Sequence, residues 1–105
     1  MCNKDVEYWQ TTGEPSAPYN CTAYNITAGG LSVGCLPGYD GGLSQFFNLQ
    51  VLQAKADNKA VFNATGVKSG DFSVYSLEPG TAYELHIWSE NSKGRSSSVV
   101  LMAET

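Results

Sequence analysis

The sequence predicts an all-β sandwich of about seven strands, and three observations lead to this prediction. Short runs rich in β-branched and aromatic residues recur from Ala17 onward and are separated by turn residues. No stretch carries a helical apolar stripe of useful length. The 105 residues fit one compact domain. Turns at regular spacing favour a sandwich over a barrel or a propeller blade.

The expected strands follow one another between short turns. A turn of Ala28-Gly29-Gly30 separates the first two strands, and the glycine-rich run at residues 37–42 precedes the third. The sixth strand has the clearest alternation, with Tyr83, Leu85 and Ile87 expected to point inward. The expected strands cover residues 19–24, 31–35, 45–53, 60–65, 72–77, 82–90 and 96–103.

Composition and charge exclude several classes of function. Six Lys and Arg against ten Asp and Glu give a net charge of −4, and no basic cluster is present. We therefore expect no binding of nucleic acid or of anionic membrane. No run approaches the ~18 consecutive apolar residues of a membrane span, so we expect no direct membrane insertion of this segment.

Residues 1–14 differ from the rest of the chain because they show no clear period and end in loop residues. We expect them to be a linker or the remnant of a preceding segment, and we place the β domain at residues 15–105. The N-terminus also lacks the apolar core of a secretory signal.

Cys21 and Cys35 are expected to face each other across the first hairpin. If the hairpin is centred on Ala28, opposed residues share a constant index sum, which pairs Cys21 with Cys35, Ala23 with Val33 and Asn25 with Leu31. Opposed non-hydrogen-bonded pairs bring Cβ atoms to ~4.5 Å, close to disulfide range. We predict a disulfide, and the alternative is two buried free thiols. The third cysteine, Cys2, then remains as a thiol in the N-terminal segment.

Three N-glycosylation sequons indicate a secretory route. Asn20, Asn25 and Asn63 each stand two residues before a threonine, with no proline between. This conflicts with the missing secretory signal unless the chain is part of a larger secreted or membrane-anchored protein. We therefore expect an extracellular location.

Two motifs resemble a known family. Residues 77–85 read Leu-Glu-Pro-Gly-Thr-Ala-Tyr-Glu-Leu, and residues 91–96 read Asn-Ser-Lys-Gly-Arg-Ser. They are similar to the Leu-x-Pro-Gly-Thr-x-Tyr and Asn-x-x-Gly-x-Ser motifs of fibronectin type III domains, which are immunoglobulin-like β-sandwiches. The resemblance implies that Tyr83 forms a tyrosine corner, with its hydroxyl bonded back to the loop. One departure is Cys35, which stands where the family usually has tryptophan.

A finer resemblance concerns the segments around the first turn. Residues 18–22 (Pro-Tyr-Asn-Cys-Thr) and 38–43 (Gly-Tyr-Asp-Gly-Gly-Leu) resemble the membrane-proximal type III domain of Sidestep-like and nephrin-like immunoglobulin-superfamily receptors. This resemblance implies cell adhesion or axon guidance. It also implies a protein partner, bound by this domain or by neighbouring immunoglobulin domains.

No arrangement of residues predicts catalysis, a cofactor or a metal. His86 is the only histidine, and no Cys-x-x-Cys spacing exists. The outward face of the third and sixth strands carries Phe46, Leu52, His86 and Trp88, which predicts a protein-binding patch. The alternative is scattered surface hydrophobes, with Trp88 covered by side chains of neighbouring strands.

Three functions are therefore open. The first is a non-enzymatic extracellular spacer and structural support in an adhesion receptor. The second is direct binding of a protein through the predicted patch. The third is an accessory domain of a secreted carbohydrate-active enzyme, because type III modules also occur beside glycoside hydrolases.

Overall fold

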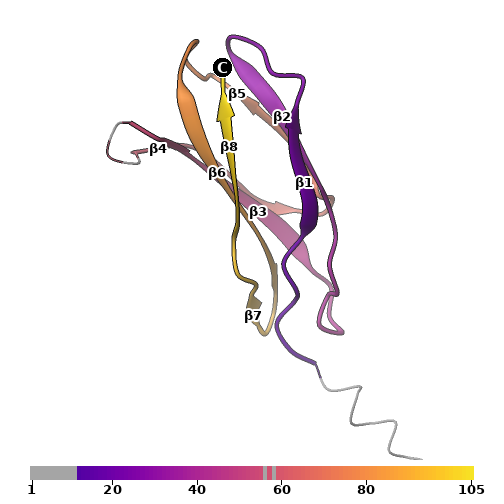
Figure 1. Cartoon of the computed structure of the whole chain (residues 1–105). Coiled ribbons are helices and arrows are strands. Elements are labelled where there is room, and N and C mark those ends of the chain that lie inside the picture. The colour runs from indigo at the N-terminus through magenta and orange to yellow at the C-terminus, as the bar shows by residue number, and fades with distance from the viewer. Residues whose placement is uncertain (1–11, 56, 58) are drawn as a thin grey trace, which may run out of the picture.

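The computed structural model describes residues 12–55, 57 and 59–105, and it places eight antiparallel strands in two sheets (Figure 1). The smaller sheet has the order β1-β2-β5. In the larger sheet β4 pairs with β3, β3 with β6, and both β7 and β8 pair with β6. This architecture confirms the predicted all-β sandwich. The strands are β1 (Tyr19–Tyr24), β2 (Gly30–Leu36), β3 (Phe46–Gln53), β4 (Lys59–Val67), β5 (Asp71–Tyr75), β6 (Ala82–Asn91), β7 (Gly94–Arg95) and β8 (Val99–Glu104).

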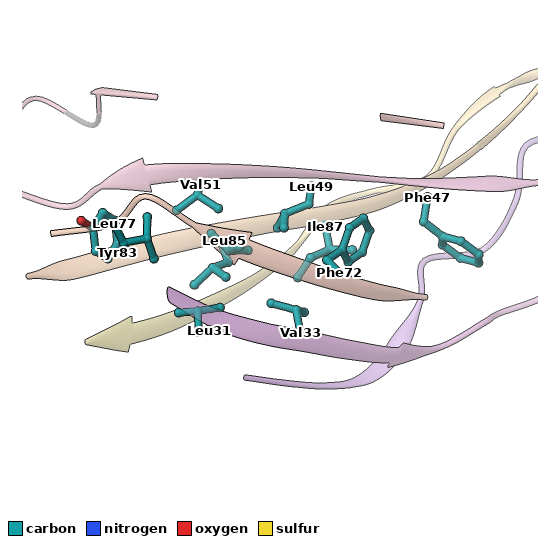
Figure 2. Close-up of a cluster of buried hydrophobic side chains, with 11 residues drawn as sticks. Leu31, Val33, Phe47, Leu49, Val51, Phe72, Leu77, Tyr83, Leu85 and Ile87 are labelled. Atoms are coloured by element: carbon teal, nitrogen blue, oxygen red, sulfur yellow. The ribbon is translucent and has the colours of Figure 1, made fainter. Parts of the chain in front are cut away.

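The core lies between the two sheets and is built from strands whose side chains alternate inward and outward. In β6 every second side chain is buried, as period-two alternation predicts. Figure 2 shows the cluster, in which side chains of β2 and β5 face those of β3 and β6. Its members are Leu31, Val33, Phe47, Leu49, Val51, Phe72, Val74, Leu77, Tyr83, Leu85 and Ile87.

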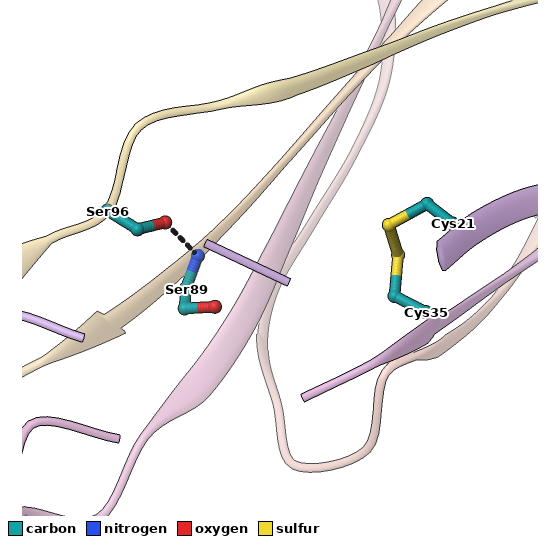
Figure 3. The surroundings of a disulfide bond; sticks show 4 residues. All are labelled: Cys21, Cys35, Ser89 and Ser96. Atoms are coloured by element: carbon teal, nitrogen blue, oxygen red, sulfur yellow. Dashed lines mark hydrogen bonds between the residues drawn. A yellow bond between two sulfur atoms is a disulfide. The ribbon is translucent and has the colours of Figure 1, made fainter. Parts of the chain in front are cut away.

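The β1–β2 hairpin has the predicted register over its central part and carries the predicted disulfide. Ala23 pairs with Val33, and Cys21 and Cys35 are bonded with their Cα atoms 4.1 Å apart (Figure 3). The predicted pairing of Asn25 with Leu31 is wrong, because β1 ends at Tyr24. Asn25 has a φ of 50°, a left-handed conformation that takes the chain out of the strand.

The fifth strand ends earlier than expected. Predicted to run to Leu77, it stops at Tyr75 because Ser76 has a φ of 64°. Leu77 still enters the core, from the following loop, and its amide donates to the Gly29 carbonyl at 3.0 Å. The point where the alternation of apolar residues breaks, between Val74 and Leu77, therefore marks the end of the strand.

The last predicted strand begins later than expected, and the additional eighth strand lies before it, outside the predicted bounds of 96–103. Gly94 and Arg95 pair with the end of β6, and β8 begins only at Val99. Between them, the Ser96 amide donates to the Ser89 carbonyl, and the Ser96 hydroxyl accepts from the Ser89 amide, each at 2.9 Å (Figure 3). The Ser96 side chain thus satisfies the backbone amide of Ser89. Regular backbone pairing with β6 resumes three residues later, at Val99.

The loop between β5 and β6 is held by Tyr83. Its ring is 1% exposed, and its hydroxyl accepts a hydrogen bond from the Glu78 amide at 2.8 Å. This is the contact that a tyrosine corner makes. Beside it, the Thr105 amide donates to the Thr81 carbonyl at 3.0 Å, which fixes the last residue at this end of the sandwich.

The opposite end of the sandwich is held by Asn91. Its side-chain nitrogen donates to the carbonyls of Gly13 and Asp40, each at 2.8 Å. The Gly13 amide in turn donates to the Gly41 carbonyl at 3.0 Å. Gly41 has a φ of 75°, and an added Cβ would collide with the Gly13 carbonyl, so only glycine fits this position. The domain boundary after residue 14 stays a prediction.

Candidate interaction face

The outer face of the larger sheet is the side of β4, β3, β6 and β8 that points away from the core. Asn63 of β4 pairs with Gln50 of β3. Gln50 pairs with His86 of β6, and His86 pairs with Val100 of β8. These four residues form what we call the cross-strand row. The residues that flank Gln50 and His86 along their strands are core side chains, namely Leu49, Val51, Leu85 and Ile87.

The structure brings the four residues of the predicted patch to this one face but does not gather them. Phe46, Leu52, His86 and Trp88 are all partly buried. Phe46 and Leu52 lie at opposite ends of β3, six residues and so about 20 Å apart. Polar Asn48 and Gln50 separate Phe46 from Leu52 along β3, whereas His86 and Trp88 are neighbours on the outer face of β6.

Trp88 is covered by Arg95. The guanidinium carbon of Arg95 lies 4.1 Å from the centroid of the Trp88 ring, within the range of a cation–π contact. The Arg95 guanidinium also donates to the Ser98 hydroxyl at 3.1 Å, so the arginine is held over the ring. In the described residues, this arrangement matches the alternative in which neighbouring side chains cover Trp88.

His86 is engaged by a carboxylate on the same strand. Its Nε2 lies 3.0 Å from Oε1 of Glu84, two residues earlier on the outer face. Both side chains are more than a quarter exposed, and a solvent-exposed pair of this kind contributes little to stability. The pair gives the centre of the face a polar character.

Asn48 lies in the middle of β3 and is only 2% exposed, although the alternation predicts an outward position. Its side-chain nitrogen donates to the Glu90 carboxylate at 3.0 Å, and its oxygen accepts from the Gly66 amide at 3.1 Å. The β3–β4 register shifts between Phe47 and Leu49, which indicates a bulge. At this bulge the Asn48 side chain satisfies the backbone amide of Gly66. The signal that could have located this bulge is Gly66, a glycine with a φ of 68° inside β4.

The most exposed apolar side chains on this face lie in β8 and were not predicted. Val100 is 50% exposed and Met102 is 62% exposed. They pair with His86 and Glu84 respectively, so both belong to the outer face. The alternation of Val99–Glu104 could have identified them, because inward Leu101 and Ala103 leave the even-numbered residues outside.

One end of the face leads into a shallow, open pocket beside the β6–β7 turn. It is lined by Leu43, Ser44, Phe46, Glu90, Asn91 and Ser92. Phe46 supplies an apolar wall and Glu90 an acidic one. Because the hollow is open and Asn91 is already engaged with Gly13, it resembles a surface groove more than a ligand cavity.

All three sequon asparagines are exposed, on two different parts of the sandwich. Asn20 lies in β1 and Asn25 follows it, whereas Asn63 lies in β4 of the other sheet. Asn20 and Asn25 have φ values of 52° and 50°, a conformation in which asparagine is enriched. Their glycosylation stays a prediction, because the backbone by itself explains why asparagine stands at these two positions.

Two further features concern only the described part of the chain. There, no group of three or more His, Cys, Asp and Glu side chains is arranged to hold a metal ion. Residues 12–55, 57 and 59–105 also contain no helix long and apolar enough to cross a bilayer. Cys2, predicted as a thiol in the N-terminal segment, lies outside the described residues.

The sandwich is similar to solved structures. It matches rat CD45 extracellular domains d3-d4 with a TM-score of 0.76 and 18% identity, over 90% of this chain and 51% of that one. A titin fragment matches with a TM-score of 0.70 and 16% identity, over 90% and 34%. FN3tt matches with a TM-score of 0.66 and 16% identity, over 85% and 91%. These likenesses show a fold of the fibronectin type III and immunoglobulin-like kind.

No family model matches the sequence, and no curated protein matches it either. The chain spans about half of the CD45 fragment and a third of the titin fragment. The same fold therefore occurs as one part of these two longer fragments.

Proposed function

We propose that this chain is a non-catalytic extracellular module that acts as a spacer and structural support in a cell-surface receptor. The single observation that carries the proposal is that Gly13, before the first strand, and Thr105, after the last strand, are held at opposite ends of the sandwich. Gly13 is hydrogen-bonded to Asn91, the last residue of β6. Thr105 is hydrogen-bonded to Thr81, which directly precedes the first residue of β6. β6 has 10 residues, so segments attached at these points are held about 33 Å apart.

The cysteines and sequons support the extracellular part of this proposal. Disulfides form and persist in oxidising compartments and are rare in the cytosol. The Cys21–Cys35 bridge joins β1 to β2, and Asn20, Asn25 and Asn63 are all exposed to a glycosylating enzyme. One structural neighbour, the CD45 fragment, is described as an extracellular region.

The receptor class is a finer part of the proposal. The segments at residues 18–22 and 38–43 support a role in cell adhesion or axon guidance, as in Sidestep-like and nephrin-like receptors. In that setting the module holds ligand-binding domains away from the membrane. Its partner is then another cell-surface protein or a protein ligand.

The test is the chemical state of the chain when it is made through a secretory host. We expect intact mass to fall on glycosidase treatment, and Cys21 and Cys35 to be alkylated only after reduction. Thr22→Ala, Thr27→Ala and Thr65→Ala each remove one sequon and keep its asparagine, so they assign the lost mass to single sites. A mass that glycosidase leaves unchanged, together with free thiols at both cysteines, would contradict an extracellular module.

A second candidate is direct protein binding through the outer face, and the exposure of Val100 and Met102 favours it. Substituting Met102→Ser or Trp88→Ser in the intact receptor should weaken cell-surface binding of its partner at normal surface expression. The control is Ser73→Ala, on the opposite sheet. Unchanged binding in both test variants would exclude direct binding through this face, and only the spacer role would remain.

A further inference from the structure

The Asn63 sequon differs from the other two because it lies on the outer face of the larger sheet. Phe62 and Ala64, its neighbours in β4, both pack against the core. Asn63 between them is exposed, so its side chain points outward with those of the cross-strand row. The Phe62 ring also contacts the Tyr75 ring edge-on, with centroids 5.4 Å apart, which ties this part of β4 to the smaller sheet.

Strand spacing gives the reach that a group on Asn63 needs. Neighbouring strands lie about 4.8 Å apart, so Gln50, His86 and Val100 follow at about 5, 10 and 14 Å across the sheet. Each is an outward-pointing residue with a partly or fully exposed side chain. An oligosaccharide on Asn63 therefore stands at one end of a row of outward-pointing residues that runs from β4 to β8.

We propose that occupancy of the Asn63 sequon by an N-linked glycan decides whether the outer face is open to a protein partner. The glycan covers the cross-strand row, and a partner can reach Gln50 and His86 only when Asn63 is unmodified. This inference rests on the proposed extracellular function, because only the secretory pathway supplies the modification.

The chemistry of the row suits a sugar. The Gln50 amide has both donors and acceptors, and the His86 ring adds a nitrogen, so both can hydrogen-bond sugar hydroxyls. Val100 and Met102 offer apolar surface beyond them, at 50% and 62% exposure. A glycan that lies along the row removes part of this apolar surface from water, which favours the covered state.

The other two sequons do not lie on this face. Asn20 and Asn25 belong to β1 and the turn after it, in the smaller sheet. The outer face of the smaller sheet carries Ser32, Gly34 and Ser73, a different surface. A glycan at Asn63 therefore controls the outer face of the larger sheet independently of the other sites.

The experiment measures how fast a bulky thiol reagent reacts with cysteines placed at chosen positions. The reagent is a polyethylene glycol maleimide of about 5 kDa, whose chain is much larger than the strand spacing of about 5 Å. The full chain, with Cys2→Ser, is secreted from a glycosylating host with Gln50→Cys, Val100→Cys or Ser73→Cys. Each is compared with and without Thr65→Ala, which removes the sequon but keeps Asn63. Circular dichroism and thermal melting establish that every variant is folded.

We expect the glycan to slow labelling severalfold at position 50, less at position 100 and not at all at position 73. Glycosylated and Thr65→Ala chains that label position 50 at equal rates would overturn the inference. The Val100→Cys variant keeps the test valid if Gln50→Cys fails to fold, because Val100 is already exposed.

Intact mass separates this inference from the proposed function. If Asn20 or Asn25 carries a glycan and Asn63 does not, the extracellular assignment stands and the inference is overturned. If glycosidase changes no mass at any sequon but Cys21 and Cys35 are bonded, only the inference is overturned; if both cysteines are also free thiols, the proposed function fails with it. If Asn63 is modified and position 50 is protected, both are supported.

Discussion

The strands β1 and β6 are held in the same sandwich by different means. β6 pairs with β3, β7 and β8, and five of its ten side chains are buried. β1 pairs only with β2, and none of its six side chains is fully buried. β1 is joined to β2 by the Cys21–Cys35 bridge and by backbone pairing, and it also lies beside β8.

The difference shows how a small domain divides its stabilisation. Burial of apolar area stabilises β6, because side chains from both sheets meet there. A strand that buries little must be retained by other interactions, and a disulfide does so by restricting the unfolded chain. Substitutions that affect packing and substitutions that affect the bridge should therefore change different properties of the protein.

The largest effect is expected from Leu85→Ala at the centre of β6. Leu85 is fully buried, and deleting its side chain leaves a cavity between the sheets. We expect a loss of about 3 kcal/mol in the free energy of unfolding, measured by urea denaturation. Thr22→Ala on exposed β1, made in a host that does not glycosylate, should change it by less than about 0.5 kcal/mol. Similar losses for the two variants would abolish the contrast between the strands.

The second effect comes from removing the bridge with Cys21→Ala and Cys35→Ala together. The cysteines are 14 residues apart, and opening a loop of that size should cost about 3 kcal/mol in the chain-entropy model. We place it second because retained structure in the unfolded chain usually lowers the measured value. Hydrogen exchange should rise first in β1, whereas β6 amides stay protected below global unfolding. Uniform loss of protection would show that the bridge supports the whole core.

A smaller effect is expected from Tyr83→Phe, which keeps the buried ring and removes the hydroxyl. The Glu78 amide then loses its partner at the tyrosine corner. We expect a loss of about 1 kcal/mol in thermal or urea unfolding. Tyr39→Phe, at an exposed tyrosine, is the matched control and should be neutral. If both variants are neutral, the corner is not needed to hold the end of the sandwich.

The smallest effect is expected from Arg95→Ala, which uncovers Trp88. Loss of the cation–π contact should cost about 0.5–1 kcal/mol. Tryptophan fluorescence, recorded in a Trp9→Phe background, should shift to longer wavelength as water reaches the ring. Lys93→Ala is the control, since Lys93 is an exposed cation in the preceding turn. An unshifted spectrum would mean that other side chains cover Trp88.

Local patterns predicted the strands and the disulfide because both depend on neighbours in sequence. β1 has the predicted bounds, and the Cys21–Cys35 pair follows from alternation and one short turn. The contacts of the candidate face depend on distant segments. Asn48 is buried by a bulge in β4, and Trp88 is covered by an arginine beyond the next turn. Neither contact leaves a periodic signal in the sequence. The sequence therefore predicted which residues lie on this face, but not which of their side chains are exposed.

The positions of Gly13, Thr105 and the bridge have a consequence for the proposed receptor when it is under tension. A pulling force applied through Gly13 and Thr105 enters at opposite ends of the sandwich. If the domain unfolds under load, the bridge keeps the loop between Cys21 and Cys35, which are 14 residues apart, from extending. The released chain is then about 45 Å shorter than without the bridge, because 14 extended residues span about 50 Å and the bridged Cα atoms are 4.1 Å apart. In the receptor that we propose, the disulfide therefore limits how much an unfolded module lengthens before the chain again bears load.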